Sequence, residues 1–143
     1  MKKVLKLMLA MAVAMITLTA CDKIDDNGDF GGYWILETLE NLEGEDITPT
    51  TSHLAWAIHK ELLEMRDLNE GKTSYFFTFS RSEKTLQLTS SFFNDGSNDT
   101  KVENTDIPEF FRVPADGHYD ILYLSNSKLI LKTNTLTYTF RKY

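Results

Sequence analysis

A strict two-residue alternation in the last 25 residues leaves this chain few possible folds. Leu136, Tyr138 and Phe140 alternate with threonines, so one face of this segment is apolar. Side chains alternate between faces in a β-strand, and short polar turns join antiparallel neighbours. The sequence therefore predicts a C-terminal antiparallel meander. Its three runs are 119–124, 128–132 and 135–141.

Aromatic residues extend the β prediction to the rest of the chain. All 17 Phe, Tyr and Trp residues follow residue 29. Such residues favour strands and bring large buried area. With the meander, about eight strands are expected in all. The further strands predicted are 32–39, 73–80, 85–90, 101–105 and 110–113.

Residues 52–70 show a different period. Their apolar side chains recur at three- and four-residue spacing, which is typical of an amphipathic helix. Thr51 or Ser52 can cap its start, and Gly71 can take the left-handed conformation that ends a helix. We expect this helix to pack on the barrel or to cap one open end. The recurring residues are Leu54, Ile58, Leu62, Met65 and Leu68.

The first twenty residues have the pattern of an export signal. Lys2, Lys3 and Lys6 precede the uncharged, mostly apolar stretch 7–18. That stretch is shorter than the roughly 20 residues that a bilayer-spanning helix needs, and it has the length of a signal-peptide core. Removal of the three lysines lowers the net charge from −6 to −9. A chain with this net negative charge lacks the positive charge that binds the phosphates of nucleic acids, so we expect no nucleic-acid partner.

Leu18-Thr19-Ala20-Cys21 resembles the lipobox of bacterial lipoproteins. The resemblance implies that residues 1–20 are removed and that Cys21 carries the lipid that holds the protein on a membrane. Residues 21–29 form an acidic tether, which is similar to the signals that send lipoproteins of the Bacteroidetes to the outer face of the outer membrane. The implied location is the cell envelope, lipid-anchored at the outer membrane, with surface exposure favoured over the periplasmic face.

Gly32-Tyr33-Trp34 resembles the opening strand of lipocalin-like, or calycin, domains, and residues 121–142 resemble their closing strands. Together with the lipobox, the chain is similar to the small lipocalin-like lipoproteins of the Bacteroidetes. The resemblance implies that residues 30–143 form one mostly β domain, a small antiparallel barrel of about eight strands. The expected helix in the middle departs from a simple meander.

Catalytic motifs are missing from the sequence. The three histidines, His53, His59 and His118, lack the spacing of a zinc helix, and no Gly-x-Ser-x-Gly elbow occurs. Acylation of Cys21 would remove the one thiol. We therefore expect no enzyme, metal or cofactor. A hydrolase that uses two of the many carboxylates is the weakest alternative.

Two functions agree with these features. The first is binding of a small apolar or amphipathic ligand inside the barrel or at its mouth. The second is docking of another envelope protein, or inhibition of a basic enzyme, through an acidic and aromatic surface. Neighbours on a strand face opposite sides, so one ring each of Phe76–Phe77, Phe92–Phe93 and Phe110–Phe111 must leave the core. The candidate ligand-binding residues are Trp34, Tyr75, Phe77, Phe79, Tyr119 and Tyr138.

Overall fold

The computed structural model describes residues 27–51, 53–69 and 73–143. The predicted signal peptide, Cys21 and most of the acidic tether lie outside these ranges. Within them, no helix is long and apolar enough to cross a membrane. The elements are η1 (Gly28–Phe30), β1 (Gly32–Glu40), β2 (Leu54–His59), β3 (Leu62–Asp67), β4 (Ser74–Arg81), β5 (Thr85–Asn94), β6 (Asp99–Val102), η2 (Asn104–Asp106), η3 (Glu109–Phe111), β7 (His118–Leu124), β8 (Lys128–Lys132) and β9 (Thr137–Lys142), where η marks a 3₁₀ helix.

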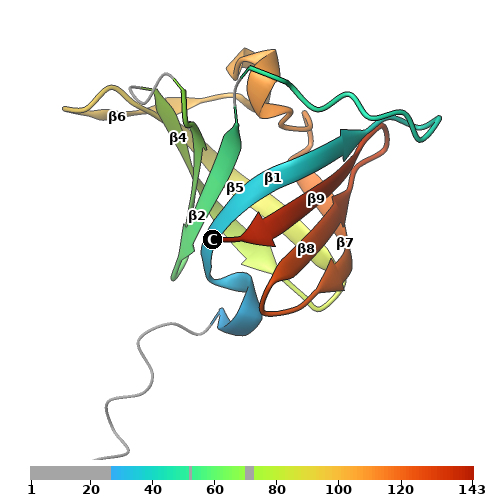
Figure 1. The fold of residues 1–143 in the computed structure, drawn as a ribbon. Helices are drawn as coiled ribbons and strands as arrows, with labels where there is room; N and C mark the ends of the chain where they lie inside the picture. The colour runs from blue at the N-terminus through green and yellow to red at the C-terminus, as the bar shows by residue number, and fades with distance from the viewer. Residues whose placement is uncertain (1–26, 52, 70–72) are drawn as a thin grey trace, which may run out of the picture.

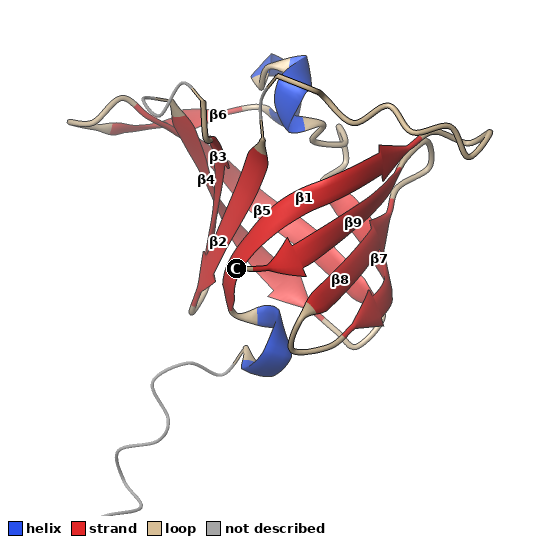
Figure 2. Ribbon diagram, viewed as in Figure 1, coloured by secondary structure: helices blue, strands red, loops and turns tan. Residues whose placement is uncertain are grey.

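Eight antiparallel strands close into a barrel (Figures 1 and 2). The order around it is β4-β3-β2-β1-β9-β8-β7-β5, and pairing of β4 with β5 completes the ring. On its other edge β5 has two successive partners, because 85–87 pair with β7 and 91–94 pair with β6. β6 therefore extends the sheet beyond the barrel. Closure leaves the eight barrel strands without a free edge.

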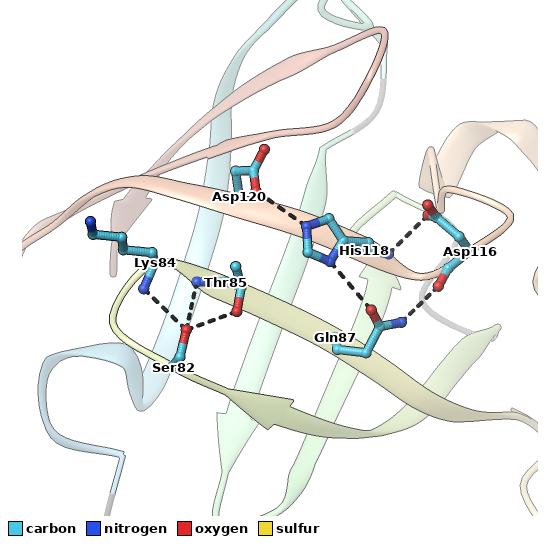
Figure 3. Close-up of polar contacts among 7 residues, drawn as sticks. All are labelled: Ser82, Lys84, Thr85, Gln87, Asp116, His118 and Asp120. Atoms are coloured by element: carbon cyan, nitrogen blue, oxygen red, sulfur yellow. Dashed lines mark hydrogen bonds and ion pairs between the residues drawn. The ribbon is translucent and has the colours of Figure 1, made fainter.

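The predicted meander is confirmed in β7, β8 and β9, and β1 lies where the sequence placed it. The predicted hairpin is also confirmed as β4–β5, with β5 continuing to Asn94. Its turn is held by Ser82, whose Oγ accepts hydrogen bonds from the backbone N–H groups of Lys84 at 3.3 Å and Thr85 at 3.1 Å (Figure 3). The alternation fails at Tyr123, which is 50% exposed after a register shift in β7. The other inward residues of the meander are buried: Tyr119, Ile121, Leu129, Leu131, Tyr138 and Phe140.

The predicted helix over 52–70 is wrong. Its described residues form the hairpin β2–β3, which pairs with β1 on one side and β4 on the other. As strands these segments bury Trp56, Ile58, Leu63 and Met65 together, whereas Leu62 points outward. If 52–70 were a helix, the edges of β1 and β4 that now pair with β2 and β3 would have no partner strand. The strand pairing that closes the barrel therefore favours the hairpin.

Two weaker strand predictions also need correction. The strand expected at 101–105 lies at 99–102 and gives way to η2. The strand expected at 110–113 is wrong, because η3 occupies this position and ends at Arg112, whose backbone is left-handed with φ 50°. Pro108 and Pro114 bracket the segment and lack the backbone donor that a ladder strand uses.

Each end of the barrel is covered by a different segment (Figure 2). At one end η1 inserts Phe30, which is fully buried, and its carbonyl accepts a hydrogen bond from Trp34 Nε1 at 2.9 Å. At the other end η2, η3 and the following loop cross the opening. There Phe111 lies 5.0 Å from Tyr75 between ring centroids. The barrel is therefore closed by side chains at both ends.

The prediction for the aromatic pairs is confirmed for the two pairs that lie on strands. Phe77 is fully buried, and its neighbour Phe76 faces outward opposite Phe92 on β5. Phe93, on the other face from Phe92, packs against the core. The third pair, Phe110–Phe111, lies in η3 and not on a strand; Phe111 is buried and Phe110 packs against the core, so the prediction for this pair is wrong.

Candidate ligand-binding site at the barrel rim

Aromatic side chains occupy the centre of the barrel. The Trp56 ring lies 5.5 Å from Tyr119 and 4.8 Å from Phe140 between centroids, and Tyr119 lies 5.6 Å from Tyr138. All four residues are fully buried. The interior of an eight-stranded barrel is wide enough for side chains or for one small ligand. Here the rings fill the middle layer.

The six predicted ligand-binding residues all belong to this core or pack against it, but they lie at different positions along the barrel axis. Trp34 and Phe79 lie at the η1 end, where Phe79 is 5.7 Å from Phe30 between ring centroids. Tyr75 lies at the opposite end under η3. Tyr119 and Tyr138 lie between them, and Phe77 is also fully buried. The structure therefore does not gather the six residues into one pocket.

A cavity of about 190 Å³, here called the rim pocket, opens at the η3 end of the barrel. Residues 107–109 and 112–114 line one side, and Thr133, Thr135, Leu136 and Tyr138 line the other. Tyr138 is the one predicted residue among them. Half of the ten lining residues are aliphatic or proline, and the other half are polar, with Glu109 and Arg112 as the charged groups.

Arg112 is held in its left-handed conformation from two sides. Its backbone N–H donates to the carbonyl of Glu109 at 2.9 Å, and its own carbonyl accepts from the Tyr138 hydroxyl at 2.6 Å. Non-glycine residues rarely adopt positive φ, and where they do the surrounding structure must enforce it. The bond from Tyr138 links this loop directly to a core residue of β9.

A second cavity of about 340 Å³, here called the polar groove, adjoins the rim pocket and shares Pro114, Thr133 and Thr135 with it. It also contains Lys132 and the network around His118, described next. A third cavity, of about 200 Å³, lies between β5, β6 and η2. All three cavities border the loops that cover the η3 end, outside the aromatic centre.

The polar network of the groove centres on His118 (Figure 3). Its Nδ1 faces Gln87 Oε1 at 3.3 Å, and its Nε2 faces Asp120 Oδ1 at 3.2 Å. Gln87 Nε2 donates to the carbonyl of Asp116 at 2.7 Å, and the Asp116 carboxylate accepts from the His118 backbone N–H at 3.0 Å. These bonds tie β5 and β7 to the loop that precedes β7. The network therefore braces one wall of the groove.

Burial changes the acidity of the tyrosines near the site. It raises the pKa of Tyr138, against smaller opposing effects of a hydrogen bond with Thr133 and of the Arg112 charge. Burial also raises the pKa of Tyr119 well above the ordinary value of 10.0. Both phenols are therefore neutral hydrogen-bond donors at neutral pH.

Three fully buried polar atoms have no hydrogen-bond partner within the described ranges: Trp56 Nε1, Tyr119 Oη and Arg112 Nε. Each of them can donate a hydrogen bond. Buried polar groups are nearly always paired, so unpaired ones call for an explanation such as a bound molecule. Trp56 and Tyr119 belong to the filled centre, whereas Arg112 lines the rim pocket, so an incoming acceptor group is relevant to Arg112 Nε alone.

Sequence reasoning missed most of the rim pocket. The sequence predicts a strand at 110–113, within the lining segment 107–114, although Pro108 and Pro114 on either side signal irregular backbone. No residue near Arg112 in the sequence indicates its left-handed conformation, because that conformation is held by a hydrogen bond from Tyr138, 26 residues away. Among the described residues, no group of three or more His, Cys, Asp or Glu side chains is placed to hold a metal ion.

The profile of the lipocalin-like domain family matches residues 16–143. The chain belongs to this lipocalin-like family. Its structure is similar to a lipocalin-like protein from Bacteroides uniformis, with TM-score 0.61 and 19% identity over 81% of this chain and 100% of that one. An uncharacterized protein from Bacteroides eggerthii is similar with TM-score 0.57 and 16% identity, over 79% and 98% of the two chains. A search of curated proteins found no match.

These comparisons confirm the predicted resemblance to lipocalin-like proteins of Bacteroides. At such low identities the solved structures support the fold alone. In this lipocalin-like barrel, the cavities described above lie at one covered end. The question of function therefore turns on the rim pocket.

Proposed function

We propose that this protein is a lipid-anchored protein of the outer membrane whose lipocalin-like barrel binds a small apolar or amphipathic ligand and catalyses no reaction. The observation that carries the proposal is the rim pocket, a cavity in which aliphatic and proline residues make up half of the lining and polar or charged residues the other half. Apolar walls combined with convergent polar groups suit an amphipathic small molecule. Its volume of about 190 Å³ favours a short ligand, and a longer one would extend into the polar groove.

The filled centre of the barrel supports a site at the rim. Trp56, Tyr119 and Phe140 are fully buried and in ring contact, so a ligand in the centre would have to displace them. Dense interiors resist such rearrangement. A ligand in the rim pocket would instead rest on Tyr138, which lines the pocket and contacts the aromatic centre through Tyr119.

A neutral probe tests ligand binding. The full lipidated chain in lipid nanodiscs is titrated with hexanamide by calorimetry, and empty nanodiscs provide the background. Leu136→Trp fills the rim pocket, and we expect it to weaken binding at least about tenfold, which corresponds to about 1.4 kcal/mol. Leu122→Trp is the matched control, because Leu122 is 56% exposed on β7 and is not among the residues that line the pocket.

Two results would contradict ligand binding at the rim. One is equal affinity of both tryptophan variants for hexanamide. The other is absence of hexanamide binding together with absence of any small molecule retained through purification, as judged by native mass spectrometry.

The membrane anchor is supported by the lipobox at 18–21 and by the acidic tether that follows. Acyl chains contribute about 0.8 kcal/mol per buried methylene, so two or three chains hold a protein firmly on a bilayer. We expect Cys21→Ser in the full chain to prevent acylation, so that cleavage after Ala20 and membrane attachment through lipid are both lost. Metabolic labelling with a fatty acid measures this directly. Unchanged labelling of the serine variant would overturn the anchor.

A second candidate function is docking of another envelope protein. It is favoured by two consecutive apolar side chains outside the barrel, Leu122 at 56% and Tyr123 at 50% exposure. A register shift between Ile121 and Tyr123 turns both outward. Exposed apolar groups of this kind often mark a partner surface. The titration separates the two functions, because docking at β7 needs no open rim pocket.

A further inference from the structure

The rim pocket contains one cation, Arg112, in a lining that is half aliphatic or proline and half polar. Arg112 is 30% exposed at its side chain, and its Nε is fully buried without a hydrogen-bond partner among the described residues. A guanidinium offers five N–H donors in a fixed planar fork and no acceptor. The buried N–H therefore requires an acceptor that the described part of the chain does not supply.

We propose that the ligand of the rim pocket carries a carboxylate and that Arg112 binds this group. The proposal rests on the proposed ligand-binding function and specifies the chemistry of the ligand. A carboxylate offers two acceptor oxygens in the geometry that the arginine fork matches. The apolar part of such a ligand would contact Ile107, Val113 and Leu136.

The backbone at Arg112 supports a dedicated role for its side chain. The left-handed conformation at φ 50° favours glycine, yet an arginine occupies the position. The hydrogen bond from Tyr138 fixes its carbonyl, so the residue is held in place from the barrel core. A conformation that disfavours the side chain is retained most readily where that side chain has a function.

The ion pair of Arg112 leaves room for a ligand. Its Nη1 contacts Glu109 Oε1 at 2.9 Å, and the Glu109 side chain is 86% exposed. An ion pair with so exposed a partner contributes little, because water solvates the free carboxylate well. A ligand carboxylate can therefore replace Glu109 at the guanidinium while the buried Nε gains a partner.

The test compares two probes of nearly equal shape. Hexanoate and hexanamide are titrated into the full lipidated chain in nanodiscs, with empty nanodiscs as background. We expect the wild-type chain to bind hexanoate at least about tenfold more tightly than hexanamide. Arg112→Gly should abolish this preference while hexanamide binding persists. Because glycine suits the left-handed backbone, the variant should fold with unchanged or higher stability.

Two further variants sharpen the result. Glu109→Gln removes the competing carboxylate and should strengthen hexanoate binding several-fold. Arg141→Gln is the matched control: it removes one positive charge from the outside of β9, where Arg141 pairs with Glu37 at 3.2 Å. It should leave the preference for hexanoate unchanged.

The outcomes separate this inference from the proposed function. Equal binding of hexanoate and hexanamide, or a preference that survives Arg112→Gly, overturns the role of Arg112 and leaves ligand binding at the rim supported. Failure of both probes to bind a folded wild-type chain that also retains no small molecule through purification overturns both.

Discussion

Two buried tyrosines have different polar environments although they lie in ring contact. The Tyr138 hydroxyl donates to the carbonyl of Arg112, whereas the Tyr119 hydroxyl is unpaired within the described ranges. A buried hydrogen bond contributes about 0.5–1.5 kcal/mol, and an unpaired buried hydroxyl contributes a desolvation penalty instead. The two residues therefore offer a matched pair of substitutions.

We expect Tyr138→Phe to lower the free energy of unfolding by about 0.5–1.5 kcal/mol, because it removes the bond to Arg112. Tyr119→Phe should raise it by about 1 kcal/mol, because it removes a buried hydroxyl whose desolvation no hydrogen bond offsets. Urea denaturation at neutral pH measures both. A loss of stability in Tyr119→Phe would show that its hydroxyl is paired in solution.

The same tyrosines predict instability in alkali. Burial raises the pKa of Tyr119 and Tyr138 above the ordinary value of 10.0, so folding favours the neutral phenols. This stability is fully present below pH 10 and is lost as the pH rises through the folded-state values. We expect unfolding above pH 10, with the last tyrosinate absorbance appearing together with the loss of circular dichroism. Ionisation of all six tyrosines without any loss of structure would contradict it.

At the scale of single elements, the β2–β3 hairpin is the most informative. Its loop is the pair Lys60-Glu61, with His59 opposite Leu62. Lys60 has φ 54°, and Glu61 is not among the positive-φ residues. Asn27 Nδ2 donates to the Lys60 carbonyl at 2.7 Å, which links the loop to η1. The turn is thus held by its surroundings rather than by residues that favour it.

We expect Lys60→Gly to stabilise the protein by about 0.5–1 kcal/mol, since glycine takes positive φ without the steric penalty that lysine has. Glu61→Gly, one residue along the same loop, should destabilise it slightly, because it adds only backbone entropy to the unfolded chain. The urea midpoints should move in opposite directions at unchanged m-value. Equal shifts would mean that the loop conformation differs from the one described.

At the scale of the whole molecule, closure of the sheet governs where function can lie. Eight strands remove the free edges, and the rings of Trp56, Tyr119 and Phe140 fill the centre. Phe30 covers one end, and the loop around Phe111 covers the other. The rim pocket and the polar groove lie at the seam between that loop and the β8–β9 turn, and a third cavity lies beside β5, β6 and η2. A site at the rim follows from a filled interior.

The alternation of apolar and polar residues was sufficient to predict strands whose inward and outward residues differ clearly, such as Tyr138 and Phe140 beside their threonine neighbours. This alternation can be seen within a single strand, without knowledge of the strands that pair with it. It failed at 54–67, where Leu54 and Ile58 satisfy both periods and the pairing needs of β1 and β4 decide for a hairpin. It also failed at Arg112, whose conformation depends on a hydroxyl 26 residues away. Contacts between segments so distant in sequence leave no mark on local periodicity, so the barrel strands could be foreseen and the rim pocket could not.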